Sequence, residues 1–295
     1  MSLEAMSPGR VAVITGGASG IGLAAAMRFA QAGMKVCIAD IGADRLGEAA
    51  AKLSSVARGS AADIMTATVD VSQIDELREL ESTVQARFGG TDILMNNAGV
   101  QPGSQMFGPH ENWQRVLGVN LWGVVNGSQI FAPPMIARGR PGLIINTGSK
   151  QGITTPPGDP AYNVSKAAVK AFTEALEHDL RNAGGKISAH LLIPGFVFTG
   201  LTARGRTEKP VGAWTPEQTV EFMVDRLGAG DFYILCPDND VPRRLDERRI
   251  LWAAGDIVEN RPALSRWHPD YAEAFATFMK GGEGLIASNA TGTKP

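Results

Sequence analysis

The stretch from Val11 to Gly22 reads VAVITGGASGIG, and it decides the fold. Its first five residues form a β-branched run typical of a buried strand, and the Ala-rich segment 23–32 that follows the glycines is typical of a helix. Glycines let the backbone approach a pyrophosphate, and the free amides at the start of the helix meet its charge. A plain tight turn is the alternative, and the strand before it and the helix after it favour the phosphate cradle.

An acidic residue ends the next predicted strand, Met34 to Asp40. Asp40 lies 20 positions after Gly20, where a dinucleotide site places a carboxylate on the adenosine ribose diol. This carboxylate would repel a 2′-phosphate, and the glycine turn carries no Arg or Lys, so the sequence favours NAD over NADP. Arg45, five residues later, could soften that preference.

Helices and strands alternate along most of the remaining chain. Strands are predicted over 64–71, 92–95, 143–146, 187–193 and 232–236, and helices over 43–56, 74–88, 111–137, from 160 onward, 216–227, 243–260 and 270–280. This alternation predicts βαβ units and a parallel sheet.

The segment 143–173 places a hydroxyl, a phenol and an ammonium at a spacing that chemistry can use. Tyr162 and Lys166 are four residues apart on one helical face, and Ser149 follows the preceding strand. A phenol has a pKa of about 10, which we expect the neighbouring ammonium to lower. Tyr162 would then exchange a proton with a substrate hydroxyl or carbonyl while Ser149 hydrogen-bonds the same oxygen. A surface i,i+4 pair is an equally good interpretation of Y-x-x-x-K alone.

Six features, in order, resemble the short-chain dehydrogenase/reductase family over roughly residues 9–236. They are T-G-x-x-x-G-x-G at 15–22, N-N-A-G at 96–99, Asn120, Ser149, Y-x-x-x-K at 162–166 and P-G at 194–195. The glycine spacing is similar to that of the compact oxidoreductase subgroup rather than the extended subgroup of epimerases and dehydratases. The resemblance implies an α/β, doubly wound Rossmann fold with a seven-stranded parallel sheet flanked by helices.

The resemblance also implies a role for each site residue. Tyr162 would be the acid/base and Ser149 would orient the substrate oxygen. Lys166 would hold the nicotinamide ribose and lower the pKa of Tyr162, and Asn120 would hold a water on the proton path. From its apolar neighbours alone, Asn120 is either a satisfied helix-bending residue or part of that path. The expected cofactor-binding residues are Thr15, Gly16, Ser19, Gly20, Ile21, Gly22, Asp40, Asp70, Val71, Asn97, Ala98, Gly99, Tyr162, Lys166, Pro194, Gly195, Val197 and Thr199.

Two departures from the family pattern stand out. Gly148 replaces a frequent serine before Ser149, and Lys150 adds a charge that we expect near the pocket mouth. The chain also continues for about 55 residues beyond Asp240, which puts the family's usual tetramer in doubt. The substrate pocket would be built from loops 101–110, 151–157 and 196–214. The last of these holds aromatic and basic side chains, which suits a mobile lid, with a disordered connection as the alternative.

The expected domain organisation is a single Rossmann domain over 7–238, with a substrate loop at 196–230. A helical extension, 239–280, would pack on it, and 281–295 would be a flexible tail. The opening MSLEAM is expected to be an unstructured lead-in.

Composition excludes several classes of partner. With 295 residues, 44% hydrophobic and 20% charged, the chain is ordinary and globular, and its net charge of -2 argues against nucleic acid. The Arg pairs at 243–244 and 248–249 flank acidic residues and are interpreted as a solvated helix face. No apolar run approaches the roughly 18 residues that span a bilayer, and no signal peptide is evident, so we expect a cytoplasmic protein without a membrane partner.

Cysteine and histidine placement agrees with that location. Cys37 and Cys236 lie in separate apolar runs, which favours buried thiols in a reducing compartment over a disulfide. The four histidines, at 110, 178, 190 and 268, have no ligand spacing, so no metal is expected.

The leading hypothesis is an NAD-dependent dehydrogenase acting on a small-molecule secondary alcohol or ketone of moderately apolar character. It would work as a homo-oligomer, either a dimer or a tetramer. A non-catalytic dinucleotide-binding sensor or scaffold is the second hypothesis, and a related lyase or epimerase is the third.

Overall fold

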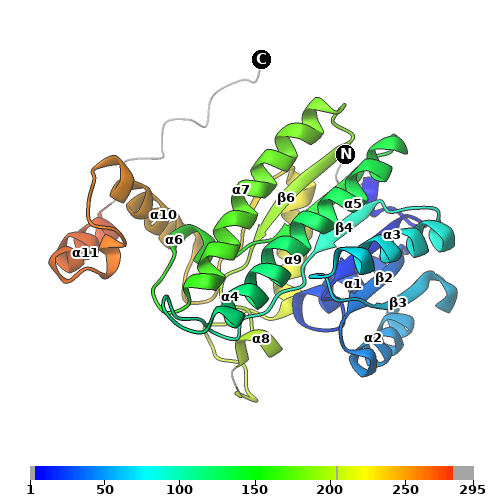
Figure 1. Cartoon of the computed structure of the whole chain (residues 1–295), viewed down its shortest axis with the longest axis horizontal. Coiled ribbons are helices and arrows are strands. Elements are labelled where there is room, and N and C mark those ends of the chain that lie inside the picture. Colours follow the sequence, from blue (N-terminus) through cyan, green and yellow to red (C-terminus); the bar gives the residue numbers. More distant parts are fainter. Residues whose placement is uncertain (1–3, 204, 282–295) are drawn as a thin grey trace. The chain divides into compact units, whose positions relative to one another are not determined.

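The computed structural model describes residues 4–203 and 205–281, which contain one seven-stranded sheet (Figure 1). Its strands are β1 (Val11–Thr15), β2 (Lys35–Asp40), β3 (Ile64–Thr68), β4 (Ile93–Asn96), β5 (Gly142–Thr147), β6 (Ile187–Ile193) and β7 (Tyr233–Leu235). Neighbouring strands pair in parallel in the order β3-β2-β1-β4-β5-β6-β7. The doubly wound α/β prediction is confirmed.

Helices cover both faces of this sheet, as the buried, β-branched strands require. They are α1 (Gly20–Gln31), α2 (Ala43–Val56), α3 (Ile74–Phe88), α4 (His110–Leu117), α5 (Gly123–Ala137), α6 (Gln151–Thr154), α7 (Pro160–Asn182), α8 (Gly200–Ala203) and α9 (Pro216–Ala229). One core cluster joins the sheet to α1, α2 and α9 through side chains such as Phe29, Leu53 and Leu227. The other joins it to α3, α5 and α7, with Phe131 fully buried at its centre.

The order of the strands places the site. β1 lies between β2 and β4, so the chain leaves β1 in one direction along the sheet and later crosses to the other. Ligands of open parallel sheets bind at this switch point, outside the carboxyl ends of the strands. The glycine turn after Thr15 and the N-N-A-G turn after Met95 both lie there.

Two local expectations are wrong. Residues 4–6 of the supposed lead-in form a 3-10 helix, and Ala5 and Met6 lie in the hydrophobic core because both are apolar and reach the sheet. The predicted helix 111–137 is interrupted by a π-helical turn, Gly118–Trp122, in which the Gly123 amide donates to the carbonyl oxygen of Gly118.

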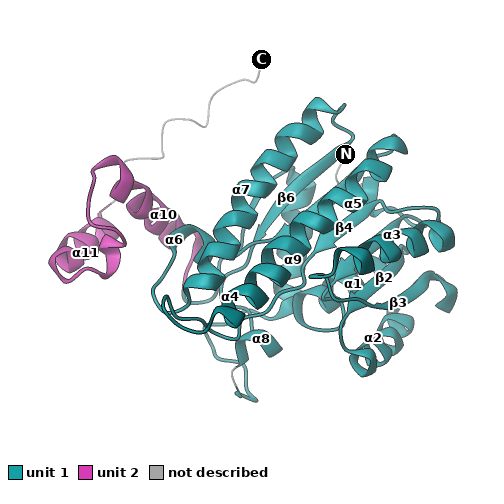
Figure 2. Ribbon diagram, in the orientation of Figure 1, with its two compact units in different colours: residues 1–240 teal, residues 241–295 magenta. Residues whose placement is uncertain are grey.

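The described residues from 241 to 281 belong to a second compact unit (Figure 2). Its helices are α10 (Arg243–Val258) and α11 (Ala272–Lys280), with 3-10 turns at Ser265–Trp267 and Pro269–Tyr271. Trp252 is its centre: its indole N–H donates to the Ser265 hydroxyl at 2.8 Å, and the Arg261 guanidinium stacks over its ring at 4.0 Å. The expectation that this unit packs on the Rossmann domain stays a prediction. Except for Gly281, the expected tail lies outside the described residues.

The expectation that the arginine pairs of α10 form a solvated face is wrong in part. Asp246, which lies between them, is only 4% exposed. Arg248 stacks its guanidinium over the Phe278 ring at 4.2 Å, because an arginine side chain gains both apolar and cation–π contact there.

Within the described ranges, no helix is both long and apolar enough to cross a bilayer. Over the same ranges, no group of three or more His, Cys, Asp or Glu side chains is arranged to hold a metal ion. Both cysteines are buried free thiols, as predicted, and burial raises the pKa of Cys37 to about 12.

Candidate active site

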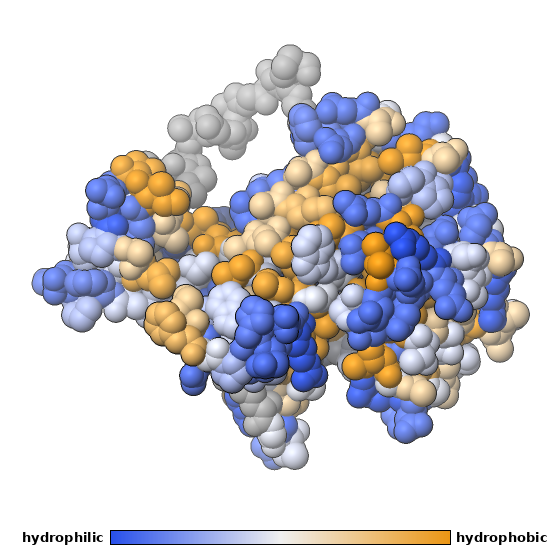
Figure 3. Space-filling model, in the orientation of Figure 1, coloured by the Kyte–Doolittle hydropathy of each residue, from blue (hydrophilic) through white to orange (hydrophobic). Residues whose placement is uncertain are grey.

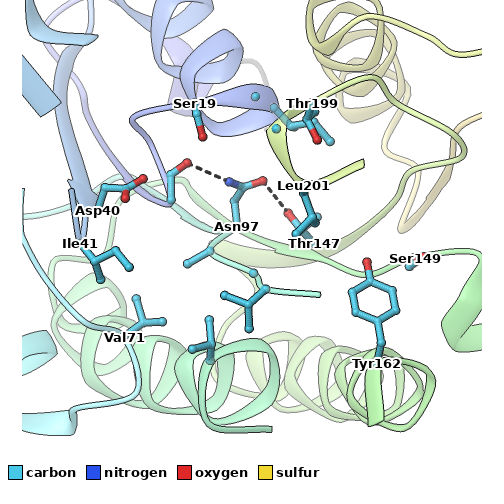
Figure 4. A pocket seen from close by; sticks show the side chains of 18 of the residues that line it. Ser19, Asp40, Ile41, Val71, Asn97, Thr147, Ser149, Tyr162, Thr199 and Leu201 are labelled. Carbon is cyan, nitrogen blue, oxygen red and sulfur yellow. Dashed lines mark hydrogen bonds between the residues drawn. The ribbon is translucent and has the colours of Figure 1, made fainter. Parts of the chain in front are cut away.

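A cavity of about 660 Å³ opens at the carboxyl ends of the strands (Figure 4). Its walls come from the glycine turn, the ends of β2, β4 and β5, helix α7 and the segment after β6. Asp40 lies at one end of this cavity and Tyr162 at the other, with its hydroxyl group pointing inward (Figure 4). One continuous cavity therefore joins the two halves of the predicted site.

The glycine turn is shaped to leave its backbone exposed to this cavity. Gly16 has φ +64°, and a Cβ atom there would meet the Cα atom of Ala98 at 2.8 Å. A Cβ atom at Gly22 would overlap the carbonyl oxygen of Gly16, so α1 can approach β1 only with glycine at this position. This close approach points the first amides of α1 at the cavity, which is the geometry that binds pyrophosphate.

Thr15 ties the glycine turn to the N-N-A-G turn. Its hydroxyl oxygen accepts the amides of Asn97 at 3.0 Å and Ala98 at 3.2 Å. The Asn97 side-chain amide donates to the carbonyl oxygens of Thr15 and Gly16, and its oxygen accepts the Thr147 hydroxyl at 3.4 Å. These bonds hold the floor of the cavity in place without any ligand.

The acidic end of the cavity is built around Asp40. Its carboxylate accepts the amides of Ala18 at 3.3 Å and Gly42 at 3.4 Å, and it pairs with the Arg45 guanidinium at 3.1 Å. Arg45 is more than half exposed and lines the same cavity. The carboxylate is thus fixed where a ribose diol could reach it, with a cation beside it.

Ser149 and Tyr162 both line the other end of the cavity (Figure 4). The Ser149 hydroxyl oxygen accepts the Gln151 amide at 3.1 Å, so its own proton is free to be donated. Burial raises the pKa of Tyr162 to about 12; the Ser149 hydroxyl lowers it and the Asp159 carboxylate raises it further. The expected lowering is therefore wrong, because loss of water around the phenolate disfavours the charged form of the phenol.

Lys166 is buried at the end of the cavity that holds Tyr162. Its ammonium donates to the carbonyl oxygen of Thr147 at 2.8 Å, and burial lowers its pKa to about 8. The ammonium lies 5.8 Å from the centre of the Tyr162 ring and lines the cavity. The surface-pair interpretation of Y-x-x-x-K is excluded, since Lys166 is only 4% exposed and Tyr162 only 9%.

Asn120 lies in the π-helical turn and is fully buried. Its side-chain oxygen accepts the Val100 amide at 2.8 Å, and its nitrogen donates to the Val100 carbonyl at 3.0 Å and to the Ser165 hydroxyl at 3.4 Å. Its side chain is therefore satisfied and holds the chain just after the N-N-A-G turn. A role in the proton path stays a prediction.

Most predicted site residues line this one cavity. Those that do not are Thr15, Gly22 and Asn120, each of which shapes the cavity from behind. Of the three loops expected to build the pocket, only 196–214 contributes to these walls. Loop 101–110 is drawn away because the Ser104 hydroxyl donates to Asp159 at 2.5 Å and the Trp113 indole holds Gln105.

Leu201 and Thr202 belong to the predicted loop 196–214, but sequence reasoning missed other wall residues, namely Ile41, Val69, Ser72, Val100, Gln114, Arg115, Gly118, Val119 and Thr147. Those next to a motif, such as Ile41 after Asp40 and Thr147 before Gly148, could have been found by extending each motif by one residue. Gln114 and Arg115 carry no such signal, because only the fold brings α4 to this edge. Lys150 was expected at the pocket mouth, but it pairs with Asp238 at 3.3 Å and is mostly buried.

Comparisons with known proteins agree with this geometry. The short chain dehydrogenase family model matches residues 10–210. A 1-deoxy-11-beta-hydroxypentalenate dehydrogenase from Streptomyces exfoliatus is 33% identical over 266 residues, covering 88% of this chain and 94% of that protein.

Solved structures of related proteins carry different cofactors. A short-chain dehydrogenase/reductase from Burkholderia phymatum, in complex with NAD, is 32% identical with a TM-score of 0.77, covering 86% of this chain and 96% of that one. The L-sorbose reductase from Gluconobacter frateurii, complexed with NADPH and L-sorbose, is 29% identical with a TM-score of 0.65, covering 74% and 89%.

Proposed function

The chain belongs to the short-chain dehydrogenase family, and on that premise we propose an NAD(H)-dependent oxidoreductase acting on a secondary alcohol or ketone of moderately apolar character. One observation carries the proposal: Ser149, Tyr162 and Lys166 share a single cavity with the glycine turn and Asp40. A binding module that only senses dinucleotide has no use for a buried phenol at the far end of the cavity from Asp40.

The residues present fit a nicotinamide dinucleotide. The backbone at Gly16 and Gly20 would hold the pyrophosphate, Asp40 the adenosine ribose and Lys166 the nicotinamide ribose. When bound, the nicotinamide would supply or accept the hydride. Everything else in the reaction would be proton transfer and positioning by the chain itself.

Tyr162 would be the acid/base through its hydroxyl oxygen. At neutral pH the phenol is protonated, since its pKa is raised, so it can donate to the oxygen of a ketone. Ser149 would donate to the same oxygen as negative charge develops there. In the alcohol-oxidising direction, the phenol must first release its proton, and a positively charged ligand beside it would favour that release.

Two features of the cavity support the finer assignments. The fixed Asp40 carboxylate favours an unphosphorylated ribose and holds the Arg45 guanidinium in an ion pair. Val100, Val197 and Leu201 lie along the wall and give it a mainly apolar surface. These observations support NAD and a moderately apolar substrate.

We also propose that the protein is cytoplasmic and forms a homo-oligomer. Figure 3 shows apolar side chains gathered over α5 and α7. Trp122, Ile136 and Val164 on or beside these helices are 55%, 37% and 48% exposed. A second copy would bury this surface, which light scattering after size-exclusion chromatography would detect as a multiple of the 31.2 kDa chain mass.

The proposed function is tested by titrating the protein with NADH and NADPH by fluorescence, followed by a panel of secondary alcohols with the preferred oxidised cofactor. We expect tighter NADH binding and turnover of at least one apolar alcohol. Tight binding without turnover on alcohols or ketones would instead support the sensor. Binding of neither cofactor would overturn the assignment.

A further inference from the structure

Asp238 follows β7 and joins two parts of the site that are distant in sequence. Its side-chain oxygen Oδ2 accepts the Lys150 ammonium at 3.3 Å and the Phe196 amide at 3.2 Å. Lys150 directly follows Ser149, and Phe196 begins the described residues 196–203 and 205–214, which we name the cover segment. One carboxylate oxygen therefore contacts both the catalytic loop and the start of the cover segment.

The other end of the cover segment is held by the next residue. The Asn239 amide donates to the carbonyl oxygen of Gly212 at 3.1 Å, and its side chain donates to the carbonyl oxygens of Val211 at 2.6 Å and Ala213 at 3.3 Å. The two ends also pair with each other, since Trp214 donates to Phe196 and Phe198 donates to Trp214, both at 2.9 Å. The cover segment is thus closed at its base and anchored on residues 238–239.

This junction is close-packed and largely removed from water. A Cβ atom at Gly195 would lie 2.5 Å from the Asp238 carboxylate, so the backbone there can meet Asp238 only as glycine. The side chains of Lys150 and Asp238 are 17% and 7% exposed. Removing one partner of so buried a pair leaves the other charge poorly solvated, unlike a surface pair.

Both parts that Asp238 joins line the cavity. Ser149 lies at its Tyr162 end, and Val197 and Leu201 of the cover segment are also wall residues, whereas Thr199 lies beside Ser19 (Figure 4). We propose that Asp238 is a positioning residue that sets the spacing between Ser149 and the cover segment, and through it the fit of the substrate. This inference rests on the proposed function.

The test compares Asp238→Asn, Lys150→Met and their double variant with Lys150→Arg, which keeps the charge. Glu177→Gln is the matched control: Glu177 also has a mostly buried carboxylate that accepts a backbone amide, from Ala189 at 2.7 Å, and pairs with Arg181. Glu177 lies on α7, contacts β6 through that amide, and is not a wall residue of the cavity. Each variant is measured for KM and kcat on an accepted alcohol, for NADH affinity, and for amide hydrogen exchange over 196–203 and 211–214 without substrate.

We expect Asp238→Asn and Lys150→Met each to raise KM by about tenfold, with NADH affinity changed less than about threefold. The double variant should raise KM no more than either single variant does, because both changes break the same contact. Lys150→Arg keeps the charge and should leave KM close to the wild-type value. Amide exchange over the cover segment should be about tenfold faster in Asp238→Asn, and unchanged in Glu177→Gln.

Unchanged exchange in Asp238→Asn would overturn the anchoring, and faster exchange with wild-type KM would overturn the positioning role. If the KM increases of the two single variants add up in the double variant, Asp238 and Lys150 act independently and the proposed coupling between them is contradicted. If the wild-type protein turns over no alcohol or ketone, the proposed function fails, whereas the exchange measurement still decides whether Asp238 holds the cover segment.

Discussion

The Lys166 ammonium lies 5.8 Å from the centre of the Tyr162 ring and donates to the carbonyl oxygen of Thr147 instead of to the phenol. The two side chains are therefore neighbours whose electrostatics are set mainly by burial. Burial raises the pKa of the phenol to about 12 and lowers that of the ammonium to about 8. At neutral pH the raised pKa keeps the phenol protonated, which is the form required to donate a proton to a ketone.

Replacing Tyr162 with Phe should lower turnover by about 10²–10⁴-fold, because the proton donor is lost while the ring and its contacts remain. NADH affinity, measured by fluorescence titration, should stay within a few-fold of wild type. Tyr233→Phe is the control, since Tyr233 is on β7, bonded to Glu174 and 46% exposed. Wild-type turnover in Tyr162→Phe would exclude it as the acid/base.

Replacing Asp40 with Ala should weaken NADH binding by about tenfold, because charged hydrogen-bond partners contribute about 1.5–3 kcal/mol. NADPH binding should improve at the same time, since Arg45 would be released to meet a 2′-phosphate. Asp44→Ala is the matched control, as Asp44 is exposed on α2 and is not a wall residue. A wild-type protein that already prefers NADPH would contradict the role given to Asp40.

Replacing Lys166 with Met should remove a specific pH dependence of stability. Between the folded-state pKa of about 8 and the ordinary lysine pKa of 10.5, the unfolded chain binds a proton that the folded chain does not, so wild-type stability rises with pH through this window. The free energy of unfolding of wild type should therefore rise relative to Lys166→Met by up to about 3 kcal/mol across this window. Urea denaturation at pH 7 and pH 10 measures it, with Lys170→Met as the control for loss of a lysine from α7. A constant difference between the two proteins would show that the ammonium is not desolvated.

Replacing Gly22 with Ala should reduce the free energy of unfolding by about 1–3 kcal/mol and weaken NADH binding, because the added methyl group displaces the Gly16 carbonyl and the Asn97 amide. Gly47→Ala is the contrasting change: its Cβ atom would meet nothing within 4 Å on helix α2. That variant should be more stable by about 0.5–1 kcal/mol. Chemical denaturation of both variants checks the pair, and equal effects would contradict the close approach at Gly22.

Local signals predicted the fold well. The bounds of β1, β6, α2 and α3 match their predicted ranges because β-branched runs and helical periodicity are properties of neighbouring residues. The phosphate cradle and the Ser149–Tyr162–Lys166 group were likewise recognisable, since each motif is short and has a fixed spacing.

Long-range contacts explain what the sequence could not predict. Lys150 and Asp238 are 88 residues apart, and nothing local indicates that one neutralises the other. Ser104 likewise reaches Asp159 across 55 residues, which draws loop 101–110 off the cavity. The direction of the Tyr162 pKa shift was missed for the same reason, because burial is a property of the folded chain and not of a four-residue spacing.

The π-helical turn at Gly118–Trp122 has a consequence for insertions and deletions. A π turn carries one residue more than the α-helical turn it replaces, so it advances the helix after it by about 100° relative to an uninterrupted helix. Deleting one residue between α4 and α5 would let the two helices merge into a single regular one. The merged helix would be regular, but the Asn120 side chain would be rotated away from the Val100 backbone that it now binds. An insertion or deletion at this turn would therefore change the site by rotating Asn120, while the hydrophobic pattern of the helix would stay nearly intact.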